Sequence, residues 1–119
     1  ALYDPNSRAG ALMVLALERK AELYSTDHVR EEMEDILHRK LGYAGDHVKE
    51  AVAALPTEWV DRAIYDEELN AASKAVRDEA DASLLALAHI MGCEVVTGDK
   101  EVLGARFRKV RVRRLRDAV

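Results

Sequence analysis

Three acidic residues of this chain, Glu32, Asp81 and Asp99, lie where a carboxylate could take part in chemistry. Asp99 follows the apolar run 95–97 after one glycine, and ligands of open α/β sheets bind beyond the carboxyl ends of the strands. A carboxylate at such a strand end can hold a divalent cation. The alternative is an ordinary turn in which Asp99 caps a short helical stretch at 100–103.

Asp81 lies at the start of an expected helix over residues 80–91. It precedes Leu84 and Leu85 by three and four residues, so it shares their inward face. Because a helix N-terminus stabilises an anion, Asp81 could equally be an N-cap. Asp78 stands just before the same turn and enlarges the acidic cluster.

Glu32 belongs to a second expected helix, which ends near residue 40. The apolar stripe of this helix contains Val29, Met33, Ile36 and Leu37. At about 100° per residue, Glu32 falls at the border of that stripe. This position suits a side chain at the mouth of a site, and it also suits the polar rim of an amphipathic helix.

The three acids would form a metal site if they converged in the folded chain. Carboxylates gathered in one cleft repel each other unless a cation lies between them, and hard oxygen ligands favour Mg²⁺ or Mn²⁺. Such a site can activate water and hold the oxygens of a phosphodiester. Spacing alone does not establish the convergence.

The elements that would position these acids alternate between strands and helices. This alternation predicts one α/β domain over residues 1–119 with a mostly parallel sheet, and Gly92 is a good helix stop. The expected strands are 21–24, 58–60, 94–97 and 110–113, and the expected helices are 11–16, 29–40, 48–55 with Asp46 as its cap, 66–76 and 80–91.

Composition excludes several classes of protein. Hydrophobic residues make up 49% of the chain and charged residues 34%. The longest apolar run, 11–17, is far shorter than the roughly 20 residues of a membrane span, and the first residues lack a signal-peptide pattern. We therefore expect a cytoplasmic protein. The single cysteine, Cys93, excludes an internal disulfide and is expected to be buried.

Charge is distributed unevenly along the chain. Residues 104–119 carry a net charge of +6, whereas the rest of the chain carries −10. A basic segment of this kind is typical of a surface that binds phosphate groups. It also suits a solvated edge strand protected against aggregation by its charges.

Three segments together resemble the PIN domain family: residues 77–102 (RDEADASLLALAHIMGCEVVTGDKEV), 24–37 (YSTDHVREEMEDIL) and 109–119 (KVRVRRLRDAV). The resemblance implies a three-layer α/β/α fold and a ribonuclease that depends on Mg²⁺ or Mn²⁺. Many small members are toxins of the VapC type paired with an antitoxin protein, and homodimers occur. The residues that match the family's metal-binding acids are Glu32, Asp81 and Asp99, with Thr97 as the adjacent hydroxyl residue and Asp78 as a further acid.

The chain departs from the family pattern at its beginning. The family starts with a central strand that ends in Asp-x-Asn and supplies the first metal-binding acid. We expect this strand to lie before Ala1, because Asp4, the nearest acid, stands in an Asp-Pro-Asn turn. The 119 residues alone should therefore be a poor nuclease. The alternative is a degenerate, non-catalytic module that binds a protein or RNA. A nucleotide-binding regulator is disfavoured, since no glycine-rich loop follows any expected strand.

Overall fold

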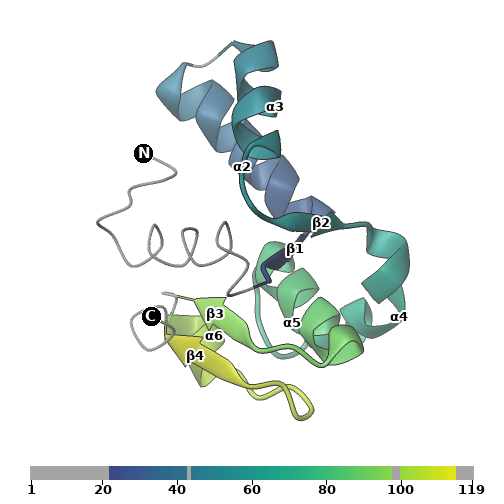
Figure 1. Cartoon of the computed structure of the whole chain (residues 1–119). Helices are drawn as coiled ribbons and strands as arrows, with labels where there is room; N and C mark the ends of the chain where they lie inside the picture. Colours follow the sequence, from purple (N-terminus) through teal and green to yellow (C-terminus); the bar gives the residue numbers. More distant parts are fainter. Residues whose placement is uncertain (1–21, 43, 98–99, 115–119) are drawn as a thin grey trace.

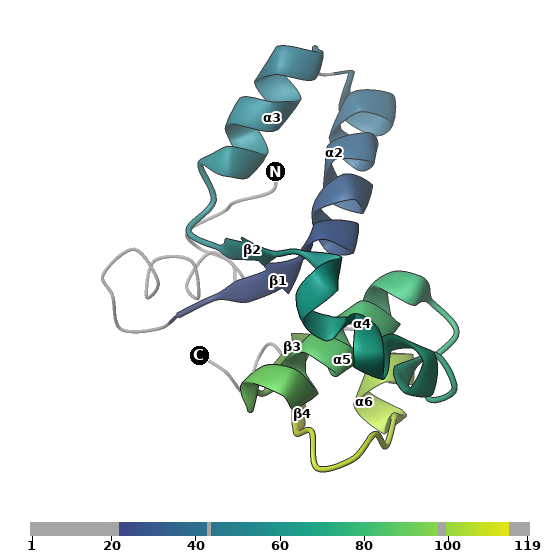
Figure 2. The same cartoon turned by 90° about the vertical axis from the view of Figure 1, so that its right-hand side faces the viewer.

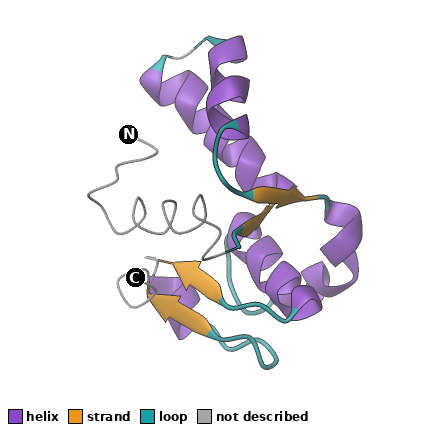
Figure 3. Cartoon of the chain, in the orientation of Figure 1, coloured by secondary structure: helices purple, strands orange, loops and turns teal. Residues whose placement is uncertain are grey.

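The computed structural model describes residues 22–42, 44–97 and 100–114, except for the side chains of Lys40 and Leu41. Strands and helices alternate along most of this length (Figures 1 and 3). In chain order the elements are β1 (Tyr24–Thr26), α2 (Asp27–Leu41), α3 (Gly45–Ala53), β2 (Glu58–Val60), α4 (Arg62–Ala72), α5 (Glu79–Met91), β3 (Val95–Thr97), α6 (Lys100–Gly104) and β4 (Val112–Arg114).

The four described strands form two parallel pairs. β1 pairs with β2, with Ser25 opposite Trp59, and β3 pairs with β4, with Val96 opposite Arg113. The expectation of parallel pairing is confirmed for these strands. The structure does not join the two pairs into the single sheet that we expected.

Helix α5 lies at the centre of the larger hydrophobic core. Leu85 and Ala86 are fully buried, and the helix packs against α4, α2 and both β1 and β3. Figure 2 shows β1 and β2 between the α2–α3 hairpin above and α5 below. The main buried residues of this core are Tyr65, Ala72, Val76, Ala82, Leu85, Ala86, Leu87, Val95, Val102 and Phe107.

A second, smaller core holds the α2–α3 hairpin together. Leu37, Val48 and Val52 are buried there, and Met33 and Trp59 pack against them. The hairpin projects at the end of the molecule opposite β3 and β4 (Figure 1). The larger part of the apolar interior therefore lies around α5, and only a few side chains hold α3 in place.

Several element boundaries differ from the sequence-based expectation. Helix α4 begins four residues earlier than expected, because the Asp61 side chain accepts a hydrogen bond from the Ala63 N–H and caps it. The expected cap of α3, Asp46, lies inside the first turn instead, and Ala44 is the N-cap. The expected helix at 11–16 lies outside the described residues.

The position of the first strand and the burial of Cys93 also differ from the sequence-based expectation. β1 begins three residues later and ends two residues later than expected, because Ser25 and Thr26 extend the strand before Thr26 caps α2. Cys93 is exposed rather than buried. It follows Gly92, whose left-handed backbone (φ 68°) ends α5, so it lies in the connection to β3 and not inside the strand.

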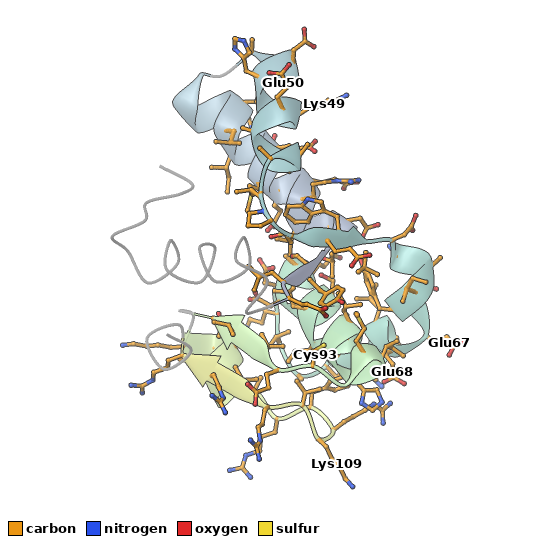
Figure 4. All side chains as sticks on the ribbon, in the orientation of Figure 1. Lys49, Glu50, Glu67, Glu68, Cys93 and Lys109 are labelled. Atoms are coloured by element: carbon orange, nitrogen blue, oxygen red, sulfur yellow. The ribbon has the colours of Figure 1, made fainter. Side chains whose placement is uncertain are left out.

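The basic C-terminal segment is engaged in surface ion pairs. Arg113 and Arg111 face Glu94 at 2.9 and 3.7 Å, and Arg108 pairs with Glu68 at 2.5 Å. Figure 4 shows Glu68 of α4 beside the loop that carries Lys109. These contacts favour the solvated-strand explanation of the charge. None of the described helices has the length and apolar character that crossing a membrane requires.

Candidate metal centre

Glu32 lies on α2 and is exposed to solvent. Helix α2 begins at Asp27 because the hydroxyl of the preceding residue, Thr26, accepts a hydrogen bond from the Val29 N–H at 3.1 Å. The buried stripe is narrower than the sequence suggested, since Ile36 is 46% exposed whereas Leu37 is buried. Glu32 therefore lies on the solvent-exposed side of α2.

Helix α5 begins with a carboxylate cap. Oδ1 of Asp78 accepts hydrogen bonds from the backbone N–H groups of Ala80 at 2.8 Å and Asp81 at 3.2 Å. The capping role considered for Asp81 therefore belongs to Asp78. Asp81 lies in the first turn and is half-buried.

Thr97 ends β3, opposite Arg114 of β4, and is half-buried. Asp99 lies outside the described residues. Within the described ranges, no group of three or more His, Cys, Asp or Glu side chains is arranged to hold a metal ion. The assignment of Glu32, Asp81 and Asp99 as ligands stays a prediction.

The donor chemistry nevertheless fits a hard divalent cation. Glu32 and Asp81 contribute carboxylate oxygens, the ligands that Mg²⁺ and Mn²⁺ prefer. The helices that carry them, α2 and α5, contact each other. The described part of the chain thus brings two of the three expected ligand-bearing elements together, and the third expected ligand, Asp99, follows β3 in the sequence.

Asp27, at the start of α2, accepts hydrogen bonds from residues of α2 and α4. Its carboxylate accepts hydrogen bonds from the Tyr65 hydroxyl, from the Arg62 N–H at 3.1 Å and from the His28 N–H at 2.9 Å. Partial burial by itself raises the pKa of Asp27, but these donors outweigh it and hold the pKa below its ordinary value. Burial and the Asp27 carboxylate raise the pKa of Tyr65. Asp27 therefore stays ionised and ties α2 to α4.

A buried hydroxyl pair joins α2 to α5. Thr26 Oγ1 and Ser83 Oγ are 2.8 Å apart. The sequence pattern did not single out Ser83. The available signal was one serine inside the apolar run of α5, a position where a polar group needs a partner.

A polar pocket of about 500 Å³ opens beside these groups. Glu32, Asp78 and Asp81 are not among the described residues that line it. Acidic side chains outnumber basic ones, so the pocket has no evident preference for a phosphate. Its polar lining includes Asp27, His28, Glu31, Arg62, Asp66 and Glu79.

The comparison with protein families identifies the class of this protein. The family model of the PIN domain matches residues 1–101. The chain therefore belongs to the PIN domain family, whose fold is generally that of nucleases and whose members generally use divalent metals. No curated protein and no solved structure shows a significant match to the chain.

Proposed function

We propose that this protein is a metal-dependent endoribonuclease in which Glu32, Asp81 and Asp99 hold one or two Mg²⁺ or Mn²⁺ ions. The observation that carries the proposal is the family match over residues 1–101, a range that includes all three acids. When bound, the ion supplies neutralisation of the phosphodiester charge and activation of the attacking water. Thr97, at the end of β3, supports the site next to Asp99, and Asp78 fixes the start of the helix that carries Asp81.

A second part of the proposal concerns the strand that would supply the first acid. We propose that an apolar strand ending in an aspartate precedes Ala1 in the full protein. In the described part of the chain, β1 pairs with β2 alone and β3 with β4 alone. Each strand of three residues therefore has one edge with backbone groups available for a further ladder.

An apolar groove of about 550 Å³ supports this placement. It is lined from both strand pairs and from the helices on either side of β1, which is the environment of a strand buried on both faces. The buried Nε1 of Trp59, which lines the groove, has no acceptor among the described residues, and a new strand would supply carbonyl groups. Lining residues include Tyr24, Val29, Met33, Leu84, Leu87 and Val95.

Cleavage of single-stranded RNA in Mg²⁺ tests both parts. We expect little cleavage by the 119 residues and clear cleavage by a protein that also carries the upstream residues. In the longer protein Asp99→Asn should lower the rate at least tenfold, because a metal-binding carboxylate is lost. The exposed Asp46→Asn on α3 is the matched control and should leave the rate unchanged.

Two results would contradict these proposals separately. Strong cleavage by the 119 residues, lost in Asp99→Asn, would refute the missing strand and support the site. Metal binding itself is measured by heat denaturation, since an ion that binds only the folded state raises the Tm. If millimolar Mn²⁺ did not shift the Tm of the longer protein, or shifted it equally in Asp81→Asn, the metal centre would be refuted.

The second candidate is a non-catalytic PIN module that binds RNA or a protein. It is favoured by the observation that Glu32 and Asp81 are not among the described residues that line the polar pocket. Binding of single-stranded RNA without cleavage by the longer protein would select it. The VapC-type role, a cytoplasmic location and a homodimer are further proposals from the resemblance. Growth arrest on expression, relieved by a co-expressed antitoxin, tests the first of these.

A further inference from the structure

Thr26 and Ser83 are the buried polar side chains within the described core. They are 0% and 1% exposed, and they lie 57 residues apart in the sequence. Thr26 ends β1 and caps α2, whereas Ser83 lies in the first half of α5. Their contact is therefore a direct polar link between the start of α2 and the interior of α5.

The hydrogen-bond donors fix the direction of this link. Ser83 has one hydroxyl hydrogen, which it donates to the Ala80 carbonyl at 2.6 Å. Thr26 must then donate to Ser83, and its own oxygen accepts from the Val29 N–H. The result is a directed chain from Val29 through Thr26 and Ser83 to Ala80, with the Tyr65 hydroxyl as a further hydrogen-bonding neighbour of Thr26.

This chain of hydrogen bonds can form in only one relative position of α2 and α5. A slip of α5 by one turn, about 5.4 Å, would separate the two oxygens and leave both hydroxyls buried without their partners. Apolar contacts around them are not directional and would restrain the slip less. The hydroxyl pair therefore specifies the relative position of α2 and α5.

The same two helices carry candidate metal ligands. Asp81 lies two residues before Ser83, or about 3 Å along the axis of α5. Glu32 lies six residues after Thr26, or about 9 Å along α2. A change in the placement of either helix at the hydroxyl pair would change the separation of the two carboxylates.

We propose that Ser83, through its hydrogen bond with Thr26, is a positioning residue that sets the distance between Glu32 and Asp81. The proposal rests on the metal centre proposed above. Ser83 touches neither the ion nor the RNA and acts only through the placement of α5. Hydrogen-bond partners of metal ligands commonly change metal affinity by 10- to 100-fold when they are removed, and Ser83, which acts on the ligands only through helix placement, should lie at the lower end of that range.

Mn²⁺ binding to the longer protein, followed by the electron paramagnetic resonance of free Mn²⁺, tests this role. We expect Ser83→Ala to raise the Kd about tenfold. Thr26→Ser keeps the hydroxyl and should stay within about twofold of the parent protein. Ser73→Ala is the matched control, because Ser73 also donates to a backbone carbonyl, Leu69 at 2.8 Å, but is exposed on α4.

A second measurement tests the role of Ser83 independently of whether the proposed metal centre exists. Residual dipolar couplings report the orientation of α2 relative to α5 without any metal. We expect Ser83→Ala to change that orientation and Thr26→Ser to preserve it. An unchanged orientation, or an unchanged Kd in a protein that binds Mn²⁺, would overturn the role of Ser83. A parent protein that binds no Mn²⁺ would instead overturn the proposed metal centre and the role that depends on it.

Discussion

At the scale of single residues, one carboxylate connects the starts of two helices, α2 and α4. Asp27 stands in the first turn of α2, accepts from the first N–H of α4 and binds the buried Tyr65 hydroxyl. Its neighbour Thr26 links the same point to α5. The adjacent residues Thr26 and Asp27 thus link the start of α2 to α4 and to α5.

Replacing Asp27 by Asn should lower the free energy of unfolding by about 2 kcal/mol at pH 7, because hydrogen bonds to a charged acceptor are lost. The pKa of Asp27 is lower in the folded state than its ordinary value of 3.8. Its stabilisation is therefore complete above about pH 3.8 and is lost as the pH falls through the folded-state pKa. Urea denaturation at several pH values measures the effect.

The control for this prediction is Asp66→Asn. Asp66 forms an exposed ion pair with Arg62 at 2.8 Å, so its loss should cost less than about 1 kcal/mol. The difference between the parent protein and Asp27→Asn should also shrink in acid. A difference that stayed constant down to pH 2 would show that the charge of Asp27 has no part in it.

At the scale of elements, helix α5 has a well-defined signal at each end. The Asp78 carboxylate caps its N-terminus, and Gly92 ends it in the left-handed conformation. The same Asp78 matches a further acid of the family. The two roles require different chemistry of the side chain. A helix cap requires an oxygen that accepts hydrogen bonds, whereas a ligand in the family's metal-binding cluster also requires negative charge.

Asp78→Asn distinguishes the two roles. Asparagine caps helices about as well as aspartate, so we expect the free energy of unfolding to change by less than about 0.5 kcal/mol. Asp78→Ala should lose about 1 kcal/mol. We expect Mn²⁺ affinity to be unchanged in Asp78→Asn if Asp78 only caps α5. A Kd raised tenfold in a fully stable Asp78→Asn would instead make it a ligand.

At the scale of the whole molecule, the interior is divided unequally. The core around α5 contains Leu85 and many other buried side chains, whereas Leu37, Val48 and Val52 form the buried part of the core in the α2–α3 hairpin. Segments with few buried apolar contacts open at lower free energy than the centre of a domain. The hairpin should therefore be the less stable part of the described structure.

Native-state hydrogen exchange tests this division. Amides of α3, such as Val52, should exchange through an opening of lower free energy than amides of α5, such as Leu87. Truncating a buried leucine to alanine commonly lowers the free energy of unfolding by about 2–5 kcal/mol. We therefore expect Leu37→Ala to speed hydrogen exchange in α3 much more than in α5. Equal protection of both helices, lowered equally by Leu37→Ala, would show instead that the molecule unfolds as one unit.

The sequence by itself determined most of the local structure. The range of α5 to within one residue, its glycine stop and the strand at 58–60 were all predicted. These features depend on caps and on the 3.6-residue period, which act within a few residues. The boundaries that were missed, such as the start of α4, also had a local signal in Asp61 that was not used.

The tertiary structure alone decided how these elements meet. The pairing of strands into two separate parallel pairs, the Thr26–Ser83 link across 57 residues and the Asp27–Tyr65 bond across 38 residues could not be predicted. Burial of apolar surface drives packing without direction, so the sequence pattern shows which faces are buried but not which partners they meet. The three acids were chosen from the sequence, and only the packing of α2 against α5 brings the elements of two of them together.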